Sequence, residues 1–207
     1  FPSAALGWTI SNEPFFKIKQ IDNLKLRASY GENGNQTSRY SSLARVSALT
    51  DYQYTFGDGA STSIGQAITS LSNNSLKWEK TKGFNFGMDF SVLNSKIKGS
   101  LEYYTTKTNN LLWDRVIPEV TGFSSIRSNV GEIQNHGFEF NVLVNPITTK
   151  DFSWSFNVNF SANRNKITHL LGDSNGDGKE DDLISSNLFI GKSIGAIYSY
   201  KVNGIYQ

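Results

Sequence analysis

The residues that most resemble a chemical site form the acidic run Asp173–Asp182, which reads Asp-Ser-Asn-Gly-Asp-Gly-Lys-Glu-Asp-Asp. Oxygen-bearing side chains at its first, third and fifth positions, followed by Gly178, have the spacing with which an EF-hand-type loop begins to wrap calcium. Asp181 takes the ninth position, but the twelfth falls on Ile184, so the bidentate carboxylate is missing. No helical pattern flanks the run. A calcium loop and an acidic, glycine-rich connection between two strands both fit this sequence.

Other candidates for chemistry are few. The chain has no cysteine, which excludes disulfides, thiolate nucleophiles and cysteine-based metal sites. The two histidines, His136 and His169, have no partner at the spacing of a metal site or a catalytic triad. The loop Phe56–Gly59 lacks the strand–loop–helix context of a phosphate cradle. The sequence therefore predicts no catalytic, metal or cofactor site, and we expect the chain not to be an enzyme.

Two groups of side chains could instead contact a solute. Polar residues that alternate with apolar ones could line a solute path; they include Lys25, Arg27, Asp89, Lys98, Glu102, Asn157 and Asn159. Aromatic residues in polar stretches could stack on sugar rings or pack locally; they are Tyr52, Tyr54 and Trp113. The sequence assigns no substrate-binding residue.

The composition narrows the setting of these residues. The chain has 207 residues, of which 13% are aromatic and 18% charged, whereas soluble domains carry about 25% charged residues. A mean hydropathy of -0.37 and the absence of any apolar run near about 18 residues exclude a transmembrane helix. The net charge of +2 comes from residues spread along the chain, so there is no basic stripe for nucleic acid. Low charge with many aromatics indicates a surface that does not face water alone.

The dominant pattern is a period of two, which predicts strands with one apolar and one polar face. In the clearest case, Phe152, Trp154, Phe156, Val158 and Phe160 alternate with serine and asparagine. Seven strands are expected, over residues 1–10, 23–31, 76–93, 96–106, 133–145, 152–168 and 194–207.

The length of these segments favours a membrane barrel. Several alternate for about ten residues, whereas strands of globular proteins average about five to six and tilted membrane strands need about 9–11. Aromatic side chains in the apolar rows suit the interface girdles of such barrels; the candidates are Trp8, Trp78, Tyr103, Tyr104 and Trp154. The inner face of a soluble β-sandwich also alternates, so that fold is the alternative.

Two short turns set an expected register. A hairpin turn at Asn94-Ser95 pairs apolar residues with apolar residues, as in Val92–Ile97, Phe90–Gly99, Met88–Leu101 and Phe86–Tyr103. A second turn over residues 145–151, centred on Thr148, would pair Val142 with Trp154 and Phe140 with Phe156.

The other connections are long and polar, over residues 32–75, 107–132 and 169–189. Alternating short and long connections are typical of outer-membrane barrels, with short periplasmic turns and long extracellular loops. Bacterial single-chain barrels have an even number of strands, so seven strands cannot close alone. We therefore expect an all-β, antiparallel transmembrane barrel segment that belongs to a larger barrel.

Several stretches resemble the SusC/RagA family of TonB-dependent outer-membrane transporters, in the family's order and over almost the whole chain. They are residues 24–36, 76–90, 99–112, 121–123, 129–140, 189–198 and 204–207. The stretch 129–140, Asn-Val-Gly-Glu-Ile-Gln-Asn-His-Gly-Phe-Glu-Phe, is the most specific of them.

The resemblance implies a plugged barrel of about 22 strands in the bacterial outer membrane. It implies import of glycans or peptides with energy from TonB, and a SusD-like surface lipoprotein as partner. On this basis residues 1–207 are expected to be a partial barrel domain, with the plug domain and the TonB box outside this chain. The remaining partners are the rest of the barrel and outer-membrane lipid, with no nucleic acid. The rival hypotheses are a passive porin-like barrel and, less favoured by the pattern, a soluble β-sandwich carbohydrate-binding module.

Overall fold

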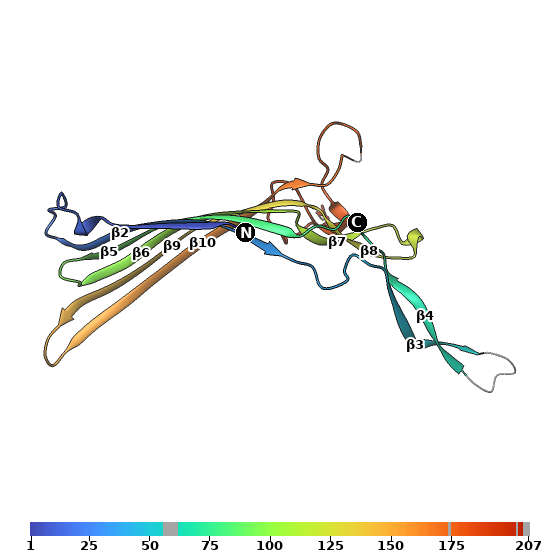
Figure 1. Cartoon of the computed structure of the whole chain (residues 1–207), viewed down its shortest axis with the longest axis horizontal. Helices are drawn as coiled ribbons and strands as arrows, with labels where there is room; N and C mark the ends of the chain where they lie inside the picture. The colour runs from blue at the N-terminus through green and yellow to red at the C-terminus, as the bar shows by residue number, and fades with distance from the viewer. Residues whose placement is uncertain (56–61, 174, 202, 205–207) are drawn as a thin grey trace.

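The computed structural model describes residues 1–55, 62–173, 175–201 and 203–204. Its main element is a six-stranded antiparallel sheet in the order β1-β2-β5-β6-β9-β10 (Figure 1). The strands are β1 Ser3–Thr9, β2 Ile21–Asn35, β5 Glu79–Val92, β6 Ile97–Asn109, β9 Gly131–Thr148 and β10 Ser153–Leu170. These correspond to the first six of the predicted strands, so the antiparallel all-β architecture is confirmed. Among the described residues, no helix is long and apolar enough to span a membrane.

The long connections contain structure that the sequence pattern did not reveal. One holds the hairpin of β3 Arg45–Thr55 and β4 Thr62–Ser70, and another holds that of β7 Leu112–Val116 and β8 Ser125–Asn129. Short 3-10 turns complete the elements: η1 Ile10–Asn12, η2 Glu119–Thr121 and η3 Ile184–Ser186. Both hairpins project beyond the same end of the sheet, opposite the end that carries the short turns (Figure 1). We call these the loop end and the turn end.

The predicted seventh strand, 194–207, is wrong over its described part, because residues 194–201 and 203–204 form no strand. Gly191 and Gly195 have φ of 79° and 81°, in the left-handed region that breaks an extended chain. The segment instead bonds to β10: the Ile167 N–H donates to the Lys192 carbonyl, and the Ile194 N–H donates to the Asn165 side chain. Residues 202 and 205–207 lie outside the described part of the chain.

The first predicted hairpin register is confirmed, with Val92 opposite Ile97 and Phe86 opposite Tyr103. The turn is closed by the Lys96 N–H, which donates to the Leu93 carbonyl at 3.3 Å. Asn94 and Ser95, its central residues, have φ of 56° and 63°. Positive φ at both central positions is the type I′ geometry that matches the twist of paired strands.

The second predicted register is wrong by four residues. The structure pairs Val142 with Val158 and Phe140 with Phe160, not with Trp154 and Phe156. The reason is that Pro146 lies within β9 rather than in the turn, next to a bulge in β10 between Trp154 and Phe156. Bulges tolerate a residue without an N–H donor. Because the shift is even, apolar residues still meet apolar residues.

The hydrophobic side chains of the sheet and the buried core are in different places. Many aromatic residues of the apolar rows remain about half exposed, from 41% for Phe138 to 53% for Trp154. The buried residues cluster at the loop end instead: Leu111, Val130, Ile133, Ile167, Leu170 and Leu188. A broad exposed apolar face on a sheet of this length marks an interaction surface for lipid or protein.

The glycine at position 99 provides a test of this packing. A Cβ on Gly99 would lie 2.5 Å from the Asn141 carbonyl oxygen on β9, whereas a Cβ on Gly83 finds its nearest neighbour at 3.5 Å. We expect Gly99→Ala to destabilise the folded full-length protein by about 1–3 kcal/mol. The matched control Gly83→Ala should be neutral or slightly stabilising. The folded protein migrates as a separate, heat-modifiable band on a gel, and the urea concentration at which half of this band is lost measures the stability of each variant. Equal midpoints for the two variants would contradict the packing described here.

Candidate functional site

The apolar face carries a continuous band of hydrophobic side chains that steps from strand to strand. On β2 the band runs from Leu24 to Tyr30, and on β10 it runs from Trp154 to Ala162. On β2 the band ends at Tyr30, which is level with Phe84 on β5. On β10 it ends at Ala162, which is level with Phe86 on β5 and therefore two residues closer to the turn end. A band that is level in a membrane must step in this way when the strands tilt by about 35–45° from the barrel axis. The face therefore has the geometry of a lipid-contacting barrel wall.

The residues predicted to form the aromatic girdles do not all lie on the apolar face, and they lie near both the turn end and the loop end. Trp8 and Trp154 are about half exposed and close to the turn end, while Trp78 stacks on Phe1 before β5 at the loop end. Tyr103 is exposed on the apolar face. Tyr104 lies on the opposite, polar face, where its hydroxyl accepts a hydrogen bond from Asn163 at 2.7 Å. Tyr104 therefore does not belong to the girdle.

An arginine organises the centre of the polar face. The Arg27 guanidinium donates two hydrogen bonds to Asp89, at 2.8 and 3.0 Å, and one to Glu102 at 2.7 Å. It lies over Gly87, where a Cβ would be 2.9 Å from the Arg27 Cζ. The missing side chain at position 87 therefore makes room for an ion network that joins β2, β5 and β6.

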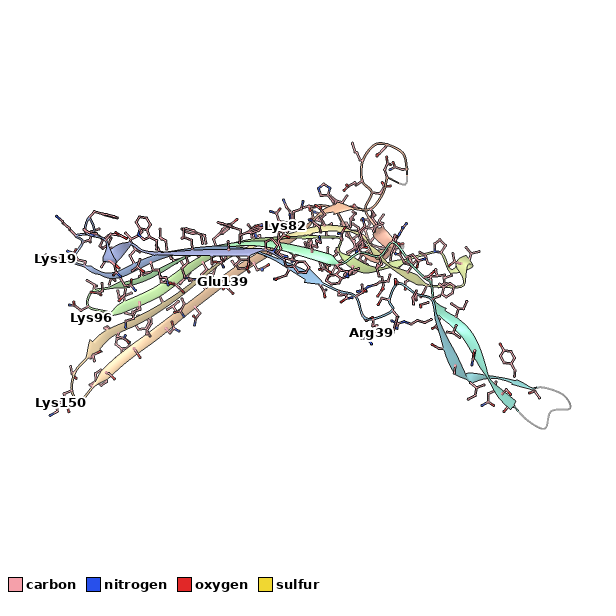
Figure 2. The ribbon with its side chains drawn as sticks, in the orientation of Figure 1. Lys19, Arg39, Lys82, Lys96, Glu139 and Lys150 are labelled. Carbon is pink, nitrogen blue, oxygen red and sulfur yellow. The ribbon has the colours of Figure 1, made fainter. Side chains whose placement is uncertain are left out.

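This network carries more negative than positive charge. Glu139 lies across from Glu102 on the neighbouring strand and is exposed. Figure 2 shows Glu139 and Lys82 on opposite sides of the sheet, as the register requires. A face with a hydrogen-bonded ion network and an exposed carboxylate can bind polar groups of a plug, a solute or water.

Amides and hydroxyls fill the rest of the polar face near β10. The Asn141 amide donates to Asn157 at 3.1 Å and also to Asn159. Lys25, Lys98 and these asparagines are therefore where the alternation predicts them, on the polar side of the sheet.

At the loop end the same face becomes apolar, which the sequence pattern did not predict. Ile133 and Ile167 are opposite each other in β9 and β10 and are buried at 7% and 0% exposure. Leu188 and Ile190 pack on them from the segment after β10. The predicted loop 169–189 thus folds back onto the sheet and closes a small core.

A half-open cavity of about 640 Å³ lies beside this core. Its wall includes an ionic chain in which Lys107 is 2.6 Å from Glu132, and His169 lies 3.8 Å from Glu132 and 3.1 Å from Glu180. The hydrogen bond with His169, and then that from the Leu170 N–H, lower the pKa of Glu180 below its ordinary value of 4.5. His169 therefore connects the sheet to the acidic connection that follows it.

The acidic run Asp173–Asp182 uses its carboxylates to fold itself. Asp173 accepts backbone N–H groups of Gly176 at 2.6 Å and Gly178 at 2.8 Å. Asn175 donates to Asp181 at 3.0 Å. In the part of the chain that the structure describes, no three His, Cys, Asp or Glu side chains converge as metal ligands. The described residues thus fit the alternative of an acidic connection, and calcium binding stays untested.

The remaining sequence candidates are dispersed. His136 lies within β9 and away from His169 in the register. Trp113 packs against the buried core, and Tyr54 is exposed on β3. The Tyr52 side chain and the loop 56–59 fall outside the described residues. Sequence reasoning missed the cavity because its wall comes from three separate connections.

Comparisons with known proteins agree with this geometry. Residues 1–205 match the family described as TonB dependent receptor-like, beta-barrel. The chain is 40% identical over 183 residues to the TonB-dependent receptor SusC of Bacteroides thetaiotaomicron, covering 86% of this chain and 18% of that protein. It is 37% identical to the TonB-dependent receptor P3 of Formosa agariphila, covering 100% of this chain and 21% of that protein. The chain thus spans about a fifth of these relatives.

A solved structure is similar as well. The structure of the RagAB peptide transporter aligns with a TM-score of 0.70 and 29% identity, over 82% of this chain and 18% of that one. The fold of this sheet is therefore shared with part of that structure.

The Glu180 contacts give a prediction on pH. Because the folded pKa of Glu180 is lowered, its stabilising contacts are present above pH 4.5 and are lost as the pH falls through the lowered value. The protection factor of the Leu170 amide, which is its exchange rate relative to the intrinsic rate at the same pH, should be high at pH 7 and should fall as the pH drops through the lowered pKa of Glu180. Glu180→Ala should abolish this pH dependence, and exposed Glu119→Ala should retain it. Unchanged exchange in Glu180→Ala would contradict the contact.

The arginine network gives a second prediction. Its side chains are each about a third exposed, at 34%, 35% and 32%, so solvent screens the ion pairs. Arg27→Gln should still destabilise the folded protein by about 1 kcal/mol at low salt, because the two carboxylates Asp89 and Glu102 lose their counter-charge. Lys98→Gln on the same face is the control and should change little. Urea midpoints at low and high salt test this; an Arg27→Gln effect that grows with salt would refute it.

Proposed function

Because the chain belongs to the TonB-dependent receptor-like β-barrel family, we propose that it forms part of the wall of a SusC/RagA-type outer-membrane transporter. The observation that carries this proposal is the six-stranded sheet with one stepped apolar band and one polar face. The apolar band contacts lipid, and the polar face lines the lumen. The turn end faces the periplasm and the loop end faces the exterior, as in other barrels with short and long connections.

The complete transporter takes up nutrients and performs no covalent chemistry in this segment. Energy comes from TonB, and the plug domain and TonB box belong to parts of the transporter other than residues 1–207. The likeness to SusC and to RagAB supports a SusD-like surface lipoprotein as partner and glycans or peptides as cargo. The location is the outer membrane of a Gram-negative bacterium, where members of this family reside.

Within this proposal the polar face has a clear role. The Arg27 network and Glu139 offer fixed hydrogen-bond donors and acceptors toward the lumen. In a plugged barrel these groups bind the plug or the water around it.

Uptake by cells tests the function. A strain lacking the full-length gene, and the same strain with the gene restored, receive labelled oligosaccharide and oligopeptide pools, with and without a working TonB. We expect the restored strain to accumulate one pool at least tenfold above the deletion strain, and only when TonB works. TonB-independent uptake would indicate a passive porin-like barrel, and a lack of any difference would reject the transport proposal.

A further inference from the structure

Charge changes abruptly where the apolar band ends toward the loop end. On each of β2, β5, β6, β9 and β10, the first two residues that lie beyond the apolar band and on the same face as the band form what we call the outer belt. On β5 these are Lys82 and Lys80, on β6 Thr105 and Lys107, and on β10 Arg164 and Lys166. On β2 and β9 they are Glu32 and Gly34, and His136 and Gln134. The belt thus holds five cations and one carboxylate, Glu32, and a second carboxylate, Glu132 on β9, lies level with Lys80.

The polar face at the same height carries no charge. The alternate positions on these strands are glycine, threonine, asparagine and isoleucine: Gly31, Asn33, Gly83, Thr81, Thr106, Thr108, Asn135, Ile133, Asn165 and Ile167. The cations are therefore concentrated on the face that bears the apolar band. A general need for solubility at the loop end would have placed charge on both faces.

Contacts within the chain neutralise only part of the belt. Lys82 and Lys107 are directly opposite each other, an arrangement that is destabilising for like charges. They turn toward separate carboxylates, Glu32 at 3.4 Å and Glu132 at 2.6 Å. Across the described residues, Lys80, Arg164 and Lys166 form no ion pair, and all three are exposed.

We propose that the outer belt binds the phosphate groups of lipids in the outer leaflet of the membrane. It lies directly beyond Tyr30 and Phe84, the last apolar residues of β2 and β5, at the level where aromatic side chains meet headgroups. Long lysine and arginine side chains reach from such positions into the headgroup layer. Charge complementarity selects an anionic headgroup, and the apolar band directly below receives its acyl chains.

The turn end differs and supplies a control. The lysines of its connections are Lys17, Lys19, Lys96 and Lys150, which lie between strands and not within them; Figure 2 labels the last three at the turn end. They are close to aspartates such as Asp22 and Asp151 in the sequence. The cationic surface contiguous with the band is thus specific to the loop end.

The inference rests on the proposed outer-membrane location and is tested without transport. Full-length protein in neutral detergent is titrated with diphosphorylated lipid A, with dephosphorylated lipid A and with inorganic phosphate. The variant Lys82→Gln/Arg164→Gln should bind diphosphorylated lipid A about 25-fold more weakly than the unaltered protein. Each cation removed should weaken binding roughly fivefold, and the variant loses two cations. The matched control Lys98→Gln/Lys150→Gln, with one lysine on the polar face and one at the turn end, should bind as the unaltered protein does.

The remaining outcomes are equally decisive. Heat modifiability confirms that each variant is folded, and Arg164→Lys should retain binding because the charge is kept. Equal affinity for the dephosphorylated lipid, equal loss in the control variant, or displacement of the lipid by millimolar phosphate would overturn the proposal. Uptake is measured separately, so intact lipid binding without uptake would reject the proposed function and leave the belt standing.

Discussion

The structure depends on one constraint: a chain in hydrocarbon must satisfy every backbone N–H and C=O by itself. A long antiparallel ladder with few bulges meets it, and β9 and β10 extend it to 18 residues each. Alternation along such a ladder separates two faces, so the register that satisfies the backbone also sorts the side chains. The apolar band, the Arg27 network and the outer belt are consequences of this sorting at different heights.

A barrel wall acts through its two faces and its loop end, and in this chain each of these surfaces depends on how neighbouring side chains pack. Gly87 gives space to the Arg27 guanidinium, and Gly99 gives space to the Phe90 ring on the other face. At the loop end, Leu188 and its neighbours fold over Ile167 and hold the connection after β10 against the sheet. The packing at the loop end therefore holds the segment after β10 beside the cavity.

Much of the sheet could be predicted from the sequence, because strict alternation and the Asn94-Ser95 turn fix strands and register together. The second turn was misplaced because Pro146 is usually a turn residue, and only the neighbouring bulge explains its place in β9. The strand expected at 194–207 failed because Gly191 and Gly195 take left-handed φ values, and only Ile194 of this segment packs on the core around Ile167. The cavity could not be predicted, since Glu180 reaches Lys107, Glu132 and His169 of the sheet only after the connection that follows β10 folds back.

The central claim is that alternate residues of one strand face lipid and lumen. Single cysteines at Phe138, Phe140 and Val142, and at Glu139 and Asn141, carry spin labels in the full-length protein reconstituted in a bilayer; this chain has no native cysteine. Collision with oxygen should dominate at the first three positions, and collision with a water-soluble nickel complex at the other two. Equal exposure of all five labels to the nickel complex would contradict a lipid-facing apolar band.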